Sequence, residues 1–460
     1  MSSIPDTVDA KPLSGAITWL REAVDPRSAE RLELNRRRWN TLPEASRTVQ
    51  QAAGRAYVAC GATHGVVERC NFACTACYLT DEANGTPDLP IEDVFRQIDE
   101  LRRHLGPMGK VQITSGEVTL LEVDDLGRIV AYARKVGLDP MVMTNGQRFV
   151  DRPGYLEKLV RDYGLRKVAI HVDLTQRGRN GTARPRTEAS LRSVRDDFAE
   201  RIRRVRRWTG RRVDAAHTIT VTRDNIDEVP DLVRWSVDNH DAFRMVSFQP
   251  VAGVGRTRDS GGEDLSLTAV WSRICEGVGR PLNRDALHFG HRACNIVCPL
   301  FVVSYGKKRE IVECVPVGDR FGLRVMTRLL DMFGGLGPMR ERPVRGLLRR
   351  LLVAATHPAT VATALAYGAL RAWRMRGKLL EIAWHAVRLR SVRVRPWILV
   401  VHKFMDPDEL TSPLGQERLR SCVFRVPVDG RMVSMCELNA TDLRLQLNRA
   451  QRRGDASSRY

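Results

Sequence analysis

Apolar positions between Ala56 and Pro250 alternate between two spacings. Short β-branched runs are separated by longer stretches in which apolar residues recur every three to four positions, as on one face of a helix. The short runs predict strands at 57–67, 110–114, 140–144, 167–173, 215–222 and 244–249. The longer stretches predict helices at 91–105, 123–136, 154–163, 187–208 and 226–238. Strands joined by helical crossovers indicate an α/β fold with a partial (β/α)6 barrel, whose chemistry lies at the carboxyl ends of the strands.

The rest of the chain divides by composition. A helix is expected from Ser14 to Glu22, followed by the arginine-rich stretch RLELNRRRWN, and a turn-rich segment from Gly253 ends the barrel. The predicted units are an N-terminal helical preamble (1–55), the partial barrel (56–252), an auxiliary-cluster segment (253–320), a basic amphipathic helical region (321–396) and a C-terminal cysteine-containing segment (397–460).

Three cysteines stand close together directly after the first predicted strand. Cys70, Cys74 and Cys77 have the spacing C-x3-C-x2-C. Three thiolates on one short loop bind three corners of a 4Fe-4S cube and leave the fourth iron open. Zinc sites usually pair two knuckles or include histidine, and no second knuckle follows at the usual distance. Zinc binding or an incidental cluster of thiols is the alternative. We find no secretory signal and expect a cytoplasmic protein, in which disulfides are rare.

This cysteine loop resembles that of the radical S-adenosylmethionine (SAM) superfamily. The resemblance implies that the open iron chelates the amino and carboxylate groups of SAM. It further implies that one electron from the reduced cluster splits the sulfonium and yields a 5'-deoxyadenosyl radical for C-H activation. A flavodoxin or ferredoxin would supply that electron. Ala76 precedes the third cysteine where the family often has an aromatic residue, and Tyr78 follows it instead.

Polar residues also follow the next three predicted strands. Ser115, Gly116 and Glu117 resemble the Gly-Gly-Glu-Pro element of the superfamily, which receives the SAM amino group. Turn-forming residues after the third strand allow close approach of backbone to a ligand, and polar residues after the fourth strand are expected near the SAM ribose. These further candidates for SAM binding are Thr144, Asn145, His171, Asp173 and Thr175. Singly, each also suits a structural role in a loop.

A second group of cysteines follows the barrel. Two of them are spaced like ligands, and the others are separated by long stretches. The candidates for an auxiliary 4Fe-4S cluster are Cys294, Cys298, Cys314, Cys422 and Cys436. The alternative is that they are small buried apolar side chains, as free cysteines often are.

The C-terminal segment resembles the tail of archaeal tetraether lipid synthases and their bacterial relatives. Those synthases join lipid chains by radical C-C coupling and carry additional iron-sulfur centres. In this chain, residues 1–59 contain no cysteine, so the cysteine-rich N-terminal domain of those synthases has no counterpart there. The residues that carry the resemblance are His402, Phe404, Met405, Asp406, Cys422, Asp429, Gly430, Arg431 and Cys436.

Basic residues outnumber acidic ones by 74 to 54, which gives a net charge of +20. Twelve basic and two acidic residues lie between Glu341 and Arg395, so half of this excess is local. Arginine and tryptophan beside apolar residues are typical of a helix lying on an anionic membrane surface. His357 and Pro358 interrupt a spanning segment. A helical bundle packed on the barrel is the alternative, and no nucleic-acid binding is expected because the aromatics form no stacking platform.

These patterns together predict a radical SAM enzyme that acts on a lipid-like substrate, peripheral at the inner face of the membrane. The expected reaction is C-C bond formation or a related modification. A peptide- or protein-modifying radical SAM enzyme with an auxiliary cluster is the first alternative. A non-catalytic scaffold protein with the same fold is the second.

Overall fold

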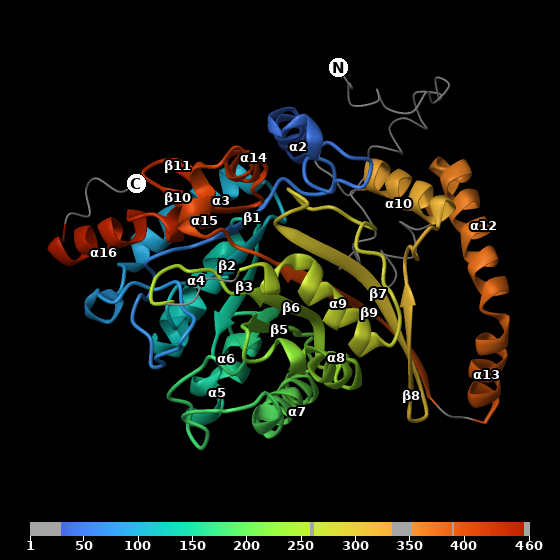
Figure 1. Ribbon diagram of the computed structural model, residues 1–460, viewed down its shortest axis with the longest axis horizontal. Coiled ribbons are helices and arrows are strands. Elements are labelled where there is room, and N and C mark those ends of the chain that lie inside the picture. The colour runs from blue at the N-terminus through green and yellow to red at the C-terminus, as the bar shows by residue number, and fades with distance from the viewer. Residues whose placement is uncertain (1–28, 258–261, 334–350, 353, 389–390, 455–460) are drawn as a thin grey trace.

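The computed structural model describes residues 29–257, 262–333, 351–352, 354–388 and 391–454. Within these residues, eleven strands form one curved sheet in the order β11-β10-β1-β2-β3-β4-β5-β6-β9-β7-β8 (Figure 1). The helix expected from Ser14 to Glu22 lies outside the described residues.

The centre of this sheet is the predicted partial barrel, which the structure confirms. Neighbouring strands from β1 to β6 pair in parallel, and each lies where the sequence predicted a strand. The first is shorter than expected. Their bounds are β1 Cys60–Ala62, β2 Lys110–Ile113, β3 Asp139–Thr144, β4 Lys167–His171, β5 Asp214–Val221 and β6 Phe243–Pro250.

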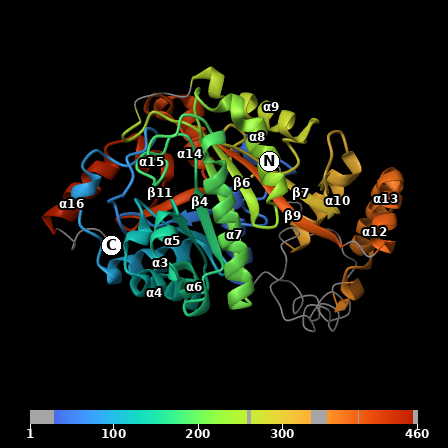
Figure 2. The ribbon, with the colours of Figure 1, turned by 90° about the horizontal axis from the view of Figure 1, so that it is seen from below.

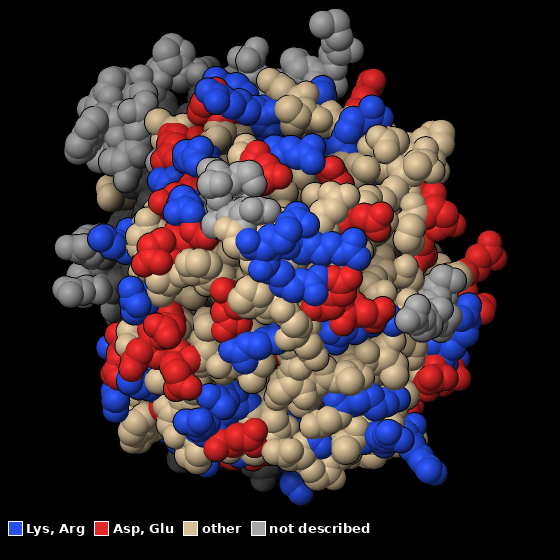
Figure 3. All heavy atoms as spheres, turned by 90° about the vertical axis from the view of Figure 1, so that its left-hand side faces the viewer, with Lys and Arg blue, Asp and Glu red and all other residues tan. Residues whose placement is uncertain are grey.

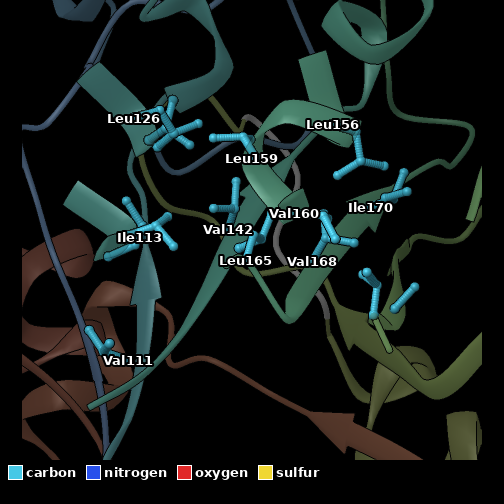
Figure 4. Close-up of a cluster of buried hydrophobic side chains, with 14 of the residues drawn as sticks. Val111, Ile113, Leu126, Val142, Leu156, Leu159, Val160, Leu165, Val168 and Ile170 are labelled. Carbon is cyan, nitrogen blue, oxygen red and sulfur yellow. The ribbon is translucent and has the colours of Figure 1, made fainter. Parts of the chain in front are cut away.

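Helices connect these strands and cover the outer face of the sheet, as Figure 2 shows from below. Their bounds are α3 Ile91–Leu105, α4 Val123–Lys135, α5 Gln147–Asp151, α6 Tyr155–Arg161, α7 Arg192–Thr209 and α8 Val229–Asp238. Figure 4 shows side chains of α4 and α6 packed against β2, β3 and β4, and Leu126, Leu159 and Val142 are fully buried there. Burying each such side chain stabilises the fold by about 1.5–3 kcal/mol.

The last part of the chain extends both edges of the barrel sheet. Beyond β6 lie β9 (Val392–His402), β7 (Asn295–Tyr305) and β8 (Lys308–Glu313), with β9 parallel to β6 and antiparallel to β7. Beyond β1 lie β10 (Phe424–Val428), which is parallel to it, and the antiparallel β11 (Arg431–Ser434). The tail therefore completes the sheet that carries the cysteine loop.

The basic region 321–396, which was predicted to be helical, is helical over most of its described residues. The prediction is wrong at the end of the region. Its helices are α10 (Arg320–Phe333), α12 (Pro358–Arg374) and α13 (Arg376–Val387), whereas β9 begins at Val392. Valine and arginine alternate from Val392 to Arg395, which is the period of a strand. The remaining helices are α2 Ala29–Thr41, α9 Leu267–Val278, α14 Pro413–Ser421, α15 Met435–Ala440 and α16 Leu443–Arg453.

No helix among the described residues is long and apolar enough to cross a bilayer.

Candidate metal centre

The three predicted cluster cysteines lie on the loop that follows β1. Burial raises the pKa of Cys70 to about 12 and raises the pKa values of Cys74 and Cys77, and the charge of a neighbouring thiol further raises the pKa values of Cys70 and Cys74. The backbone N–H of Phe72 donates to Cys70 Sγ at 3.4 Å. Buried thiols that repel one another's thiolates need a bound cation to ionise. This donor set fits a 4Fe-4S cluster.

Backbone hydrogen bonds hold this loop against the ends of two barrel strands. Thr75 N–H donates to Thr175 O, beyond β4, at 2.9 Å. Cys77 N–H donates to Thr257 Oγ1, beyond β6, at 2.8 Å. The loop has little regular structure of its own, so these contacts at the carboxyl ends of β4 and β6 determine where the thiols lie.

Two glycines allow the strand ends to approach the loop closely. Gly116 follows β2 with φ +55°, and a Cβ there would lie 2.2 Å from Val67 O. Gly255 follows β6 with φ +59°, and a Cβ there would lie 2.4 Å from Tyr78 O. Backbone atoms cannot move aside for a side chain, so both positions require glycine.

Glu117 links the end of β2 to the turn after β3. Its carboxylate accepts hydrogen bonds from Thr144 Oγ1 at 2.7 Å and from Asn145 N–H at 2.7 Å. The Asn145 side-chain amide in turn donates to Asn71 Oδ1 on the cysteine loop at 2.8 Å. Burial raises the pKa of Glu117, against the effect of these donors. The acid therefore positions the loop through the neighbouring turn.

Asp173 forms a similar network at the end of β4. Its carboxylate accepts hydrogen bonds from Thr175 N–H at 2.9 Å, from Thr220 N–H at 2.6 Å and from the His171 ring. Despite burial, the neighbouring His171 lowers the pKa of Asp173. His171 keeps 30% of its side chain exposed.

Most predicted SAM-binding side chains thus have partners within the protein. Ser115 donates to Glu68, and Glu117 and Asp173 accept bonds from neighbouring turns. The structure brings these residues together behind the cysteine loop. Contacts between them and SAM stay a prediction, and His171 has the exposed polar side chain that such a contact needs.

One residue that the sequence analysis missed is Arg179. Its guanidinium donates to Asn145 O at 2.8 Å and lies 5.0 Å from the centre of the Phe72 ring. It therefore packs against the cysteine loop and the turn after β3 together. The sequence around Arg179 does not distinguish it from the many other arginines of this chain, so this role could not be predicted.

The C-terminal helix α16 was also missed, and it braces the base of the cysteine loop. Arg444 donates to both oxygens of Glu68, at 2.9 and 3.1 Å, and lies 4.8 Å from the centre of the Tyr78 ring. Both members of the pair are almost fully buried. Although burial opposes it, Arg444 lowers the pKa of Glu68. Because 376 residues separate the partners, no local pattern predicts this contact.

Further polar contacts fasten α16 to the same loop. Asn448 Nδ2 donates to Thr80 Oγ1 at 2.9 Å, and Gln451 Nε2 donates to Gly65 O at 3.0 Å. Both side chains come from α16 and reach the segment on either side of the cysteines. The helix therefore contacts the loop at its beginning and at its end.

Three of the five candidates for the auxiliary cluster line one pocket. Each sulfur of Cys294, Cys422 and Cys436 accepts an N–H donor, at 3.3, 3.4 and 3.4 Å respectively. Such bonds to sulfur tune the potential of iron centres. The cavity between them measures about 20 Å³ and is also lined by His402. Burial lowers the pKa of His402 to about 4, so its ring is neutral at pH 7.

The predicted grouping of Cys298 and Cys314 with these residues is not observed. Cys298 lies within β7 and is 1% exposed, packed in the apolar core beside α9 with Leu399. Cys314 follows β8 and packs in a different apolar cluster. The chain runs extended from Asn295, so the spacing of Cys294 and Cys298 does not turn both sulfurs toward one centre.

Among the described residues, no three cysteine, histidine or acidic side chains converge as they would around one metal ion. In a 4Fe-4S cluster each cysteine binds its own iron, so the ligands stand further apart.

A partial barrel with three cysteines on the loop after its first strand defines the class of this protein. Residues 66–236 match the family model of the Radical SAM superfamily. This segment therefore has the sequence pattern of the radical SAM superfamily, and the match spans less than half of the chain. Enzymes of that superfamily use a 4Fe-4S cluster and SAM, and they take electrons from reductants such as flavodoxin or ferredoxin.

The chain is also similar to proteins of assigned activity. It is 28% identical over 202 residues to 7,8-dihydro-6-hydroxymethylpterin dimethyltransferase of Methanocaldococcus jannaschii, covering 42% of this chain and 36% of that protein. It is 23% identical over 203 residues to Fe-coproporphyrin III synthase of Methanosarcina barkeri, covering 44% and 46%. The match thus spans less than half of either relative. The structure of Streptococcus suis SuiB bound to S-adenosylmethionine has a TM-score of 0.34 and 14% identity, covering 48% of this chain and 47% of SuiB.

The substitution Arg444→Gln tests the brace between α16 and the cysteine loop. It leaves the Glu68 carboxylate buried without its cation, so we expect the free energy of unfolding to fall by about 3 kcal/mol. Hydrogen exchange should accelerate over residues 65–82. Anaerobic denaturant titration and exchange mass spectrometry measure both effects.

Arg449→Gln is the matched control on the same helix. Arg449 pairs with Glu82 at the surface at 2.9 Å, and its loss should cost about 0–1 kcal/mol. Equal destabilisation by the two variants would contradict the role assigned to the buried pair.

Proposed function

We propose that this chain is a radical SAM enzyme whose 4Fe-4S cluster is held by Cys70, Cys74 and Cys77. The observation that carries the proposal is the triplet of half-buried thiols on a loop that hydrogen-bonds to the ends of β4 and β6. A reduced 4Fe-4S cluster held there would supply the electron that cleaves SAM into methionine and a 5'-deoxyadenosyl radical, which would abstract hydrogen from a substrate carbon.

The chain itself contributes position and a shielded environment. Phe72 N–H donates to one cysteine sulfur, and Gly116 and Gly255 keep the strand ends in contact with the loop. The buried carboxylates of Glu117 and Asp173 accept hydrogen bonds from neighbouring turns, so neither depends on water for a partner. His171, half-exposed at the end of β4, is the side chain we assign to the SAM ribose.

Replacing Cys70, Cys74 and Cys77 together by alanine tests this assignment. We expect the variant to form no 5'-deoxyadenosine from SAM under dithionite and to lose about four irons per chain. Chromatography of the products and anaerobic iron analysis measure the two losses. Cys60→Ala, on the neighbouring strand β1, is the control and should retain both. Undiminished 5'-deoxyadenosine in the triple variant would contradict the assignment.

We further propose that Cys294, Cys422 and Cys436 hold an auxiliary iron centre. The support is that the three thiols line one pocket, that each sulfur accepts an N–H donor, and that the neutral His402 lies beside them. A 4Fe-4S cluster there requires the surrounding side chains to move outward from the small cavity, and a single iron requires the three sulfurs to move closer together.

Iron stoichiometry distinguishes these forms. Cys422→Ala combined with Cys436→Ala should lower the iron content by about four per chain if the centre is a cluster, and by about one if it is a single ion. Cys298→Ala, in the core of β7, is the control and should leave the iron content unchanged. An unchanged iron content in the double variant would show that this pocket binds no iron.

The substrate we propose is lipid-like, modified by C-C bond formation or a related reaction at an anionic membrane surface. The resemblance of the tail to tetraether lipid synthases supports this proposal. Part of that tail meets the barrel, where Gly253 N–H donates to Asp406 Oδ1 at 2.5 Å. A flavodoxin or ferredoxin is the proposed electron donor, and the inner face of the membrane the proposed location.

Lipid extracts compared with and without the gene test the substrate class. We expect at least one lipid species to disappear on deletion, to return with the wild-type gene, and not to return with the triple cysteine variant. Mass spectrometry of total lipids makes the comparison. Unchanged lipids, with the protein shown to be expressed, would exclude a lipid substrate.

A further inference from the structure

The helices α12 and α13 expose a row of large apolar side chains. Leu365, Trp373, Leu380, Trp384 and Val387 are 68, 67, 72, 56 and 76% exposed. The last three follow one another at intervals of four and three residues, which places them on one face of α13. Single exposed apolar residues are common at protein surfaces, whereas a continuous row of them marks an interaction surface.

The opposite faces of these helices attach them to the sheet extension. Tyr367 of α12 donates to Cys314 O at 2.9 Å, and Glu381 of α13 pairs with Lys308 of β8. The His385 ring lies 5.3 Å from that of Tyr305 on β7. Figures 1 and 2 both place the two helices at the edge of the molecule, outside the barrel helices. The apolar row therefore faces away from the protein.

Cations border the apolar row. The Arg376 guanidinium lies 4.8 Å from the Trp373 ring centre, and that of Arg388 lies 4.2 Å from the Trp384 ring centre. The acid in this segment, Glu381, is paired with Lys308. Apolar side chains flanked by tryptophan and unneutralised arginine match the boundary between acyl chains and anionic headgroups.

The basic surface continues from α13 onto the start of β9. Arg393 and Arg395 line a hollow of about 620 Å³ together with Arg211. Asp214 and Asp241 also line it, but their ion pairs among the described residues are with other arginines. Figure 3 shows the side of the molecule on the left of Figure 1, away from α12 and α13, where basic and acidic residues are interspersed. The start of β9, which contacts α13, thus carries two further arginines without an ion pair among the described residues.

We propose that α12 and α13 dock on an anionic membrane surface as an interfacial pair of helices. Leu365, Trp373, Leu380, Trp384 and Val387 enter the acyl boundary, and the neighbouring arginines contact headgroup phosphates. The assignment rests on the lipid-directed function proposed above and names the surface that brings the enzyme to its substrate. A nucleic acid would leave the apolar row in water, which disfavours that occupant.

Vesicle co-sedimentation of the full-length holoenzyme tests the docking surface. The probes are vesicles of phosphatidylcholine alone and vesicles with equal parts of phosphatidylcholine and phosphatidylglycerol. We expect binding to the anionic vesicles that weakens as salt is added. The variant with Trp373→Ala, Leu380→Gln and Trp384→Ala should bind the anionic vesicles at least about tenfold more weakly than the wild type. Trp208→Ala, an equally exposed tryptophan on α7, is the control and should bind like the wild type.

Three results would overturn the docking proposal. They are equal binding by the triple variant and the wild type, no preference for anionic vesicles, and wild-type self-association that the triple variant abolishes. SAM cleavage in detergent-free solution is assayed in parallel and should be unchanged in the triple variant. A wild-type protein that binds anionic vesicles but does not cleave SAM would contradict the proposed function without contradicting the docking surface.

Discussion

The structure depends on how a loop with little regular structure is held in one shape. The segment with Cys70, Cys74 and Cys77 leaves β1 and is fixed by contacts with the ends of β2, β4 and β6. From the opposite side, the buried pair of Glu68 and Arg444 attaches it to α16. A buried pair of this kind costs several kcal/mol if one partner is lost, so the two sides are coupled. The cysteine loop is held in one place because segments from the whole chain meet around it.

The tail is part of the barrel sheet for the same reason. Strand β10 pairs with β1 directly before the cysteine loop, and β9 pairs with β6 at the other edge. Cys422 precedes β10, and Cys294 precedes β7, the partner of β9. The second thiol pocket is therefore built from the chain segments that extend the sheet, and both cysteine triplets depend on one continuous architecture.

Sequence patterns predicted the parts of this architecture that local periodicity controls. The barrel strands and helices follow from alternating periods, and the cysteine loop follows from its spacing. Long-range contacts could not be predicted: no local pattern indicates that Arg444 pairs with Glu68. The spacing of Cys294 and Cys298 likewise does not indicate that Cys298 lies in the core and Cys294 in the pocket. Val392 to Arg395 were assigned to a helix because composition was given more weight than their strand-like alternation. The role predicted for Ser115 toward SAM came from resemblance and that for Asp173 from its place after the fourth strand. Both roles stay predictions, and the structure shows both side chains hydrogen-bonded within the protein.

Electron paramagnetic resonance of the anaerobically prepared, dithionite-reduced protein tests the central claim most directly. A cluster held by three cysteines has one open iron, so adding SAM should shift the g values of the reduced cluster, and the shift should vanish when Cys70, Cys74 and Cys77 are replaced. A spectrum that does not respond to SAM, or zinc in place of iron at these thiols, would contradict the account.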